Sequence, residues 1–171
     1  MIADALAELA QSAADDLPRA IAAVEADHGI VLTDSFAVEQ WCAYELELNR
    51  ATYPVLAVLW DGESTIGLVN SFSGTRDTTH QMRLLWVFRS QDQPTIARHV
   101  QYLPEALLRW LDAFPIATRR AGVSIQAIAP PNGQGVQLKY EILQAREVDG
   151  VTTYTVGISA SFPVQTIDVI P

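Results

Sequence analysis

Hydrophobic and polar positions between Tyr53 and Phe162 follow an order that predicts several strands and one main helix. A continuous apolar run is typical of a strand that is covered on both faces. Strict alternation of apolar and polar residues is typical of a half-buried strand, and apolar residues that recur every three or four positions are typical of a helix. In chain order these patterns occupy Tyr53–Trp60, Thr79–Arg89, Thr95–Phe114 and Val123–Ala129, and a long hairpin turning at Asp149-Gly150 follows. We therefore predict an α+β fold: a mainly antiparallel β-sheet with a long helix packed on one face and an N-terminal helical region.

The N-terminal helical region, 1–29, is rich in alanine and spaces its apolar residues as a helix does. Asp15-Asp16-Leu17-Pro18 interrupts this pattern, and proline is better tolerated in the first turn of a helix than in its interior. We therefore predict two helices, the second capped by Asp16 and ended by Gly29. The pattern of residues 30–50 fits strand and helix equally well.

The alternating strand Thr79–Arg89 has two unlike faces. One face is apolar throughout and is expected to lie in the core; it consists of Met82, Leu84, Trp86 and Phe88. The other is apolar in its middle and charged towards its ends; it consists of Gln81, Arg83, Leu85, Val87 and Arg89. Such a mixed face meets either a partner or a second layer of the same domain.

The segments around this strand are predicted from their turn-forming and helix-capping residues and from the spacing of their apolar residues. Asp61–Thr78, with its Gly, Ser and Thr residues, predicts an extended loop holding a short strand at Ile66–Phe72. Asp92 is the expected cap of the main helix, and Pro104 is expected to kink that helix or split it in two. The helix's buried stripe is expected to be Ile96, Val100, Leu103, Leu107 and Leu111.

The return strand of the hairpin also has two faces. Its buried face is expected to hold Tyr154, Val156, Ile158 and Phe162. The opposite row is small and polar, made of Thr153, Thr155, Gly157, Ser159 and Ser161. This row suits an ordinary solvated sheet, and it also suits the wall of a wet channel or a subunit contact.

Composition narrows the class of protein. The chain has 171 residues, about half of them apolar, which suits one domain, 1–171, with a sizeable core. No apolar run approaches the roughly 18 residues of a membrane span, and the first residues lack the basic region of a signal peptide. Cys42 is the single cysteine, so no intramolecular disulfide can form, and a packed thiol is the expected role.

The charge is acidic and uneven. The net charge is −9, and residues 1–50 alone hold ten acidic residues against Arg19 and Arg50. Proteins that bind duplex DNA present a basic stripe that neutralises phosphates, and this sequence has none. The charge therefore argues against binding to duplex DNA. It suits a surface past which DNA must slide without sticking, and solubility explains the same charge more simply.

Residues with catalytic or metal-binding chemistry are scattered. His28, His80 and His99 fall on three different predicted elements without the spacing of zinc ligands. No Gly-x-Ser-x-Gly turn and no glycine-rich phosphate loop after a strand occurs. We predict no catalytic, cofactor-binding or metal-binding residues, and therefore not an enzyme.

Four local features, taken in order, carry a resemblance to a known family. The first is the helical region broken at Asp16-Leu17-Pro18, and the second is the Tyr53–Val58 strand. The third is a polar loop that begins at Arg76 and leads into a strand ending at Phe88, followed by the Asp92–Leu111 helix. The fourth is the Gly122–Ile128 strand with the closing hairpin after it. Together they span most of residues 14–163. In this arrangement the chain resembles the tail terminator (tail-completion, or neck) proteins of tailed bacteriophages.

The resemblance implies a structural virion protein that is assembled in the host cytoplasm. Members form hexameric rings that cap the tail tube, stop its polymerisation and join it to the head-side neck or connector protein; a sheath protein is a further candidate partner. Genome DNA passes through the central hole without sequence-specific binding, and no membrane is involved.

The resemblance also suggests which residues contact neighbouring subunits or the tube. The candidates lie on the mixed strand face, at the start of that strand, and in a C-terminal arm, 164–171, that follows a sheet-and-helix core, 53–163. They are Arg83, Leu85, Val87 and Arg89; Arg76 and Asp77; and Val169 and Ile170. The Asp61–Thr78 loop is a further candidate.

Three alternatives to the terminator function stay open at this point. One is another phage neck or baseplate component, or the equivalent part of a phage-derived injection machine. Another is a small-molecule-binding α+β domain whose pocket Trp86, Tyr140 and Tyr154 would line. An enzyme is the third, although no clustered set of titratable residues favours it.

Overall fold

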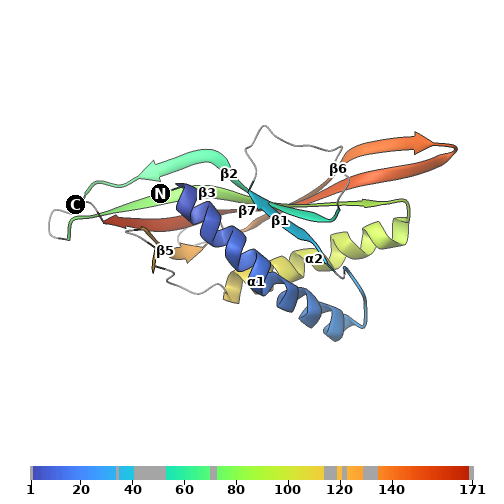
Figure 1. Cartoon of the computed structure of the whole chain (residues 1–171), viewed down its shortest axis with the longest axis horizontal. Coiled ribbons are helices and arrows are strands. Elements are labelled where there is room, and N and C mark those ends of the chain that lie inside the picture. The colour runs from blue at the N-terminus through green and yellow to red at the C-terminus, as the bar shows by residue number, and fades with distance from the viewer. Residues whose placement is uncertain are drawn as a thin grey trace.

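β7 (Val151–Val169), a strand of 19 residues, runs through the middle of the structure (Figure 1). A computed structural model describes residues 2–33, 35–40, 53–69, 73–113, 119–120, 123–128 and 135–169. Within these ranges the chain forms two helices and one seven-stranded sheet, which confirms the predicted α+β class.

The sheet is built outwards from β7. One edge of β7 pairs antiparallel with β3 (Thr75–Ser90), and β2 (Val55–Ile66) and the short β1 (Ala37–Gln40) follow in that direction. On its other edge β7 pairs first with β6 (Gln137–Val148) and then with β5 (Val123–Ile128), which carries β4 (Arg119–Arg120). All these pairings are antiparallel except that of β1 with β2, which is parallel.

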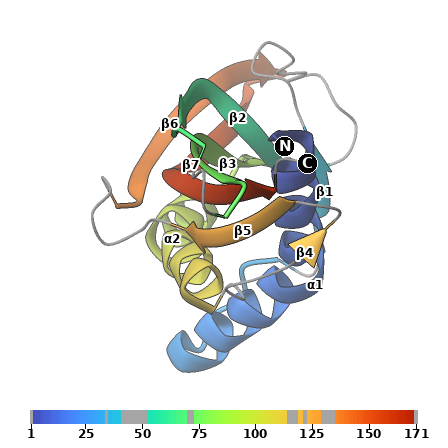
Figure 2. The ribbon, with the colours of Figure 1, turned by 90° about the vertical axis from the view of Figure 1, so that its left-hand side faces the viewer.

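Both helices lie on the same side of the sheet (Figure 2). Met82, Leu84, Trp86 and Phe88 of β3 face them and are buried, as their alternation predicted. The predicted face of β7 joins the same cluster, with Val156, Ile158 and Phe162 buried and Tyr154 packed at its border. Neither helix that the structure describes is long and apolar enough to span a membrane.

The N-terminal region is a single helix, α1 (Ile2–His28), so the predicted break at Asp15–Pro18 is wrong. A proline inside a helix costs roughly 3 kcal/mol, but a helix packed along its whole apolar stripe recovers more than that through burial. The stripe runs unbroken past Pro18 as Ala5, Leu9, Ala13, Leu17, Ile21 and Val24. Asp16 is consequently a surface residue near Ser12 and Arg19 and not a cap.

Gly29 ends α1 as predicted. It has a φ of 63°, and the amide of Ile30 donates to the carbonyl of Glu25 at 3.1 Å, the six-residue closure of a helix C-terminus. The Glu25 carboxylate then accepts from the amides of Leu32 and Thr33 at 2.7 and 3.3 Å. These bonds turn the chain back towards β1, the element for which the sequence pattern had no preference.

The main helix is α2 (Gln93–Ala113), and it runs through Pro104 without splitting. Asp92 caps it as predicted, because its Oδ2 accepts from the amide and the hydroxyl of Thr95 at 2.9 and 2.6 Å. These two bonds hold the pKa of Asp92 below its usual value. Of the predicted stripe, Val100 is half-buried and the rest is buried.

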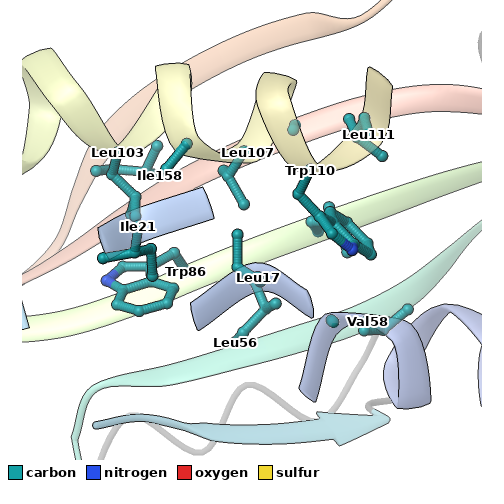
Figure 3. Close-up of a cluster of buried hydrophobic side chains, with 14 of the residues drawn as sticks. Leu17, Ile21, Leu56, Val58, Trp86, Leu103, Leu107, Trp110, Leu111 and Ile158 are labelled. Atoms are coloured by element: carbon teal, nitrogen blue, oxygen red, sulfur yellow. The ribbon is translucent and has the colours of Figure 1, made fainter. Parts of the chain in front are cut away.

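The core between sheet and helices is filled by side chains from five elements (Figure 3). Leu103, Leu107, Trp110 and Leu111 descend from α2 and meet Leu17 and Ile21 of α1, with Leu56 and Val58 of β2, Trp86 of β3 and Ile158 of β7 beneath them. The indole Nε1 of Trp110 donates to Ser12 Oγ of α1 at 3.2 Å, so the buried ring keeps a partner for its polar group.

One segment that was predicted as a loop is mostly strand. Most of the predicted Asp61–Thr78 loop belongs to β2 and β3. Residues 67–69 lie outside any strand, so the separate strand predicted at Ile66–Phe72 is not formed there. Residues 70–72 lie outside the described residues.

The predicted hairpin turn at Asp149-Gly150 is confirmed. The two residues have φ angles of 53° and 79°, which suit a tight two-residue turn.

The expected C-terminal arm, 164–171, is also strand over most of its length. Residues 164–169 continue β7, between β3 and β5, and Val164 and Thr166 are buried. The apolar side chain of Val164 is thus covered within the sheet and not left on a free tail. Ile170 and Pro171 lie outside the described residues.

Replacing Leu107 by alanine should lower the free energy of unfolding by about 2–5 kcal/mol, because Leu107 is fully buried between α2 and the sheet and truncation leaves a cavity. Leu138→Ala is the matched control, since the same change at this partly exposed residue should stay within roughly 0.5 kcal/mol. Urea unfolding of both variants measures the difference. Equal losses would contradict the placement of the core.

Candidate functional site

A trough of about 580 Å³ hollows the face of the sheet that is turned away from the helices. Figure 2 shows β2 and β6 rising on either side of β3 and β7 on this side of the molecule. The trough residues are Asp61 and Glu63 of β2, Gln81, Arg83 and Leu85 of β3, Gly135, Gln137, Leu138, Lys139, Glu141 and Leu143 in and before β6, and Ser159, Ser161 and Pro163 of β7.

A small apolar cluster underlies one end of the trough. It consists of Val55, Ala57, Leu59, Leu85 and Val87, with Ala37, Tyr53 and Leu143 packed against it. Gly157 makes this packing possible, because a Cβ atom there would stand 3.0 Å from Leu143 Cδ1 and 3.2 Å from Leu85 Cδ1. The missing side chain lets β6 and β3 close over β7 at this point.

The sides of the trough carry ion pairs. Arg83 lies 2.5 Å from the carboxylate of Asp61, and Lys139 lies 2.8 Å from that of Glu141. All four side chains are partly exposed, so water and salt screen these pairs and they add little to stability. Their effect is to give the trough a polar, nearly charge-balanced lining.

The small polar row of β7 follows this face, as its alternation predicted. Ser159 and Ser161 line the trough, and the Ser159 hydroxyl donates to the carbonyl of Lys139 at 3.4 Å. Thr153 and Thr155 line a second hollow, of about 340 Å³, beside Arg89 and the end of β6. The row therefore borders two wet hollows within the chain.

Of the predicted contact residues on β3, Arg83 and Arg89 reach these hollows, but Leu85 and Val87 do not offer a free surface. Leu85 is 6% exposed and Val87 is 0% exposed, both inside the small apolar cluster. Among the described residues, their neighbours in this cluster come from β1, β2 and β6 of the same sheet and from Tyr53, so neither a partner nor a separate layer is seen covering them. Sequence alternation identified the face but not what covers it.

The other predicted contact residues lie at the far end of the sheet. Arg76 pairs in register with Asp168, Asp77 with Ile167, and Val169 with Thr75, so the fold brings Arg76, Asp77 and Val169 together. The carbonyl of Asp77 also accepts from the amide of Gly67 at 2.8 Å. Ile170 is outside the described residues.

Sequence reasoning missed a surface on β6. Leu138, Tyr140 and Ile142, which we call the β6 apolar row, face the helix side of the sheet yet are 42%, 51% and 52% exposed. α2 approaches only part of this row, through Val100 and Pro104. The alternation in the sequence revealed the row, but no local signal shows that the helix leaves it uncovered.

A second exposed apolar group lies at the end of β2. Ile66, Leu68 and Val69 are 61%, 97% and 43% exposed, and we call them the β2-end group. Apolar residues scattered singly on a surface are ordinary, whereas contiguous groups mark contact sites. Among the described residues, β6 and the end of β2 each carry such a group, and a further exposed pair, Val148 and Val151, lies face to face at the turn between β6 and β7.

The aromatic residues expected to line a small-molecule pocket do not meet at one opening. Trp86 is fully buried and lies 4.7 Å from the ring of Phe36, whereas Tyr140 is half exposed on β6. Tyr154 lies at the border of the core.

The histidines have structural partners. His80 is buried, with Nδ1 2.8 Å from Ser64 Oγ and Nε2 3.3 Å from Thr166 Oγ1, which ties β2, β3 and β7 together. His28 lies 3.0 Å from Glu105, which also binds Arg109, and Arg109 reaches back to Asp27 of α1. The hydrogen bond from Arg109 holds the pKa of Glu105 below its usual value against the opposing effect of burial, and His28 adds to the lowering.

His99 packs between α2 and β3. Its ring stacks on Phe88 at 4.4 Å, and Nδ1 donates to the carbonyl of Thr95 at 2.9 Å. Burial lowers the pKa of His99, because it penalises the charged ring more than the nearby carbonyls stabilise it. Among the described residues, no group of three or more His, Cys, Asp and Glu could hold a metal ion.

Comparison with known proteins gives no assignment: no family model matches the chain, and no curated protein matches it significantly.

Stability should fall as the pH drops from about 7 to 5, and His99 should account for part of the loss. Its pKa is lowered in the folded state, so the unfolded chain takes up a proton at about pH 6.5 before the folded chain does. His99→Gln should therefore make the loss of stability between pH 7 and 5 smaller.

Urea unfolding at pH 7, 6 and 5 tests this, with His28→Gln as the control on the exposed helix end. An identical pH dependence in wild type and His99→Gln would contradict it.

Proposed function

We propose that the protein is a structural subunit of a tailed-bacteriophage neck, a tail terminator. It self-associates into a ring, six subunits in the family that the sequence resembles, which caps the tail tube and joins it to the head-side neck proteins. The observation that carries the proposal is the β6 apolar row beside a strand edge that no other described strand pairs.

The edge of β6 is the strongest support. Within the described residues β6 pairs only with β7, so the ladder groups on its outer edge have no strand partner there. Natural proteins keep such edges short, cover them or charge them, because an exposed edge templates pairing with another chain. Here a strand of 12 residues carries an exposed apolar row, as expected of an edge that a neighbouring subunit covers.

The β2-end group supports a head-to-tail arrangement. A ring needs two different surfaces on each subunit, one of which meets the other on the next copy. The end of β2 and the strand β6 lie towards opposite ends of the long axis in Figure 1. Ile66, Leu68 and Val69 thus provide an apolar counterpart for the β6 apolar row.

The charge agrees with a conduit for DNA. The net charge of −9 repels phosphates, so DNA would pass a ring of these subunits without being held. In this proposal the partners are further copies of the chain, the tail tube protein and the head-side connector, and the site of action is the virion neck.

Tyr140→Lys should weaken assembly by about tenfold or more, because a lysine in the centre of an apolar contact loses its water without a partner. Light scattering and negative-stain images, with the protein alone and with tail tubes, should show wild-type rings or capped tubes and a shift of the variant towards monomer.

Gln101→Lys is the charge-matched control on the exposed side of α2 and should assemble normally. A wild-type protein that stays monomeric and ignores tubes would refute the proposal. Rings that form equally well with Tyr140→Lys would refute the assignment of β6 as the contact.

A further inference from the structure

The outer edge of β6 carries a segment that complements itself when two copies of it run antiparallel. Residues 138–142 alternate apolar and charged side chains, with Lys139 and Glu141 on either side of Tyr140. Reversal of the chain direction exchanges Lys139 with Glu141 and leaves Tyr140 in place. A second copy of the segment therefore offers the opposite charge at each charged position.

The two kinds of side chain lie on different faces of the sheet. Lys139 and Glu141 line the trough on the open face, 2.8 Å apart, and their side chains are 69% and 46% exposed. The β6 apolar row lies on the helix side and is exposed as well. Both faces of this stretch are therefore accessible to a second copy of the chain.

The backbone of β6 has room for one more strand. Within the described residues β6 pairs only with β7, so its outer edge is open there to a strand added from another chain. A two-fold axis perpendicular to the sheet makes two β6 strands antiparallel and keeps each face on its own side. The apolar row of one copy then meets the apolar row of the other, and the charged residues meet charged residues.

Charge selects one register for such a pair. With Tyr140 on the axis, Lys139 lies opposite Glu141 of the partner subunit. Leu138 then lies opposite Ile142 of the partner subunit. Opposite charges directly across a ladder stabilise it, and the symmetry supplies this pair twice. Registers centred on Lys139 or Glu141 would set like charges against each other, and one centred on Leu138 would pair neither charge with an opposite one.

The fold also limits how far the pairing extends. The register of β6 against β7 shifts between Ile142 and Gln144, and this bulge interrupts the regular ladder. Registers centred at or beyond Ile142 would run across the bulge, whereas the register centred on Tyr140 uses the regular stretch before it. A hollow of about 190 Å³ between α2 and β6 gives apolar side chains of the second copy a place to be buried.

We propose that two copies of the chain form a symmetric dimer through antiparallel pairing of their β6 edges, with Tyr140 at the two-fold axis. Both copies use the same edge, so the association closes at two and does not run on into a fibre. One edge holds one strand partner at a time, so this dimer and the ring contact on β6 exclude each other. The dimer is a form of the free chain and does not depend on the ring. It covers the edge of a subunit that has no tube to cap, a role that rests on the proposed function.

Sedimentation velocity of the full chain without tail tubes, over a range of concentrations, should show a dimer that dissociates on dilution. Lys139→Glu and Glu141→Lys should each raise the dissociation constant about tenfold or more, because the two-fold axis turns each change into two like-charge contacts. The double variant Lys139→Glu/Glu141→Lys restores opposite charges across the axis and should dimerise as wild type does. Arg19→Glu on α1, at a side chain that is 85% exposed, makes the same change in net charge as Lys139→Glu and should have no effect.

Disulfide formation tests the register. In a Cys42→Ser background, Tyr140→Cys places two thiols opposite each other, within the range of Cα separations that a disulfide spans. Mild oxidation should therefore link two copies, which a non-reducing gel detects. Glu147→Cys on the same strand is the control, because its two thiols would lie roughly 45 Å apart at about 3.3 Å per residue and should not link.

A wild-type chain that stays monomeric at every concentration, or that forms free rings in place of dimers, would overturn the proposal. A double variant that dissociates as readily as the single variants, or equal linking of Glu147→Cys and Tyr140→Cys, would overturn it too. No tube is present in these measurements, so their failure is distinct from a failure of the tube-capping experiment.

Discussion

The pairing of β3 with β7 is the constraint on which the other elements depend. It runs in unbroken register from Thr75 opposite Val169 to Ser90 opposite Tyr154. One face of this ribbon carries the apolar residues that both helices cover, and the other carries the polar rows that line the two hollows. The outer edges of the same two strands receive β2 on one side and β5 and β6 on the other. A change that broke this register would therefore disturb the core and the candidate sites together.

Local signals in the sequence predicted the parts of the fold that local physics decides. The alternation of β3, the Asp92 cap and the Asp149-Gly150 turn each depend on a few neighbouring residues, and each is confirmed. The predictions that failed depend on contacts between distant segments. Pro18 predicts a break when only its neighbours are considered, but packing along the whole buried stripe keeps α1 continuous. The segment after Phe162 resembles a free arm in the sequence, but it pairs with β3 and β5 as part of β7.

The candidate sites were harder to predict for the same reason. Arg83 and Arg89 were found from alternation, but Leu85 and Val87 belong to the same row and are buried by residues from other strands. The open-face position of Arg146, opposite Thr153, was not predictable, because a bulge changes the face of every residue that follows it and a bulge of one residue leaves no clear mark in the pattern of β6. The β6 apolar row was visible as a pattern, but its exposure depends on where α2 lies.

That exposure follows from the lateral position of β6 in the sheet. Leu138, Tyr140 and Ile142 pair with residues of β7 that are buried under the helices, but the row itself lies to the side of α2. The tip of the β6–β7 hairpin is uncovered for a different reason, which is length. With a rise of about 1.5 Å per residue, the 21 residues of α2 cover roughly 30 Å, whereas the 19 residues of β7 extend over roughly 60 Å at about 3.3 Å each. Figure 1 shows the β6–β7 hairpin reaching beyond the helices at its tip. Neither the tip nor the side of β6 is therefore covered by a helix, and the proposed self-association would supply the cover that the β6 apolar row lacks among the described residues.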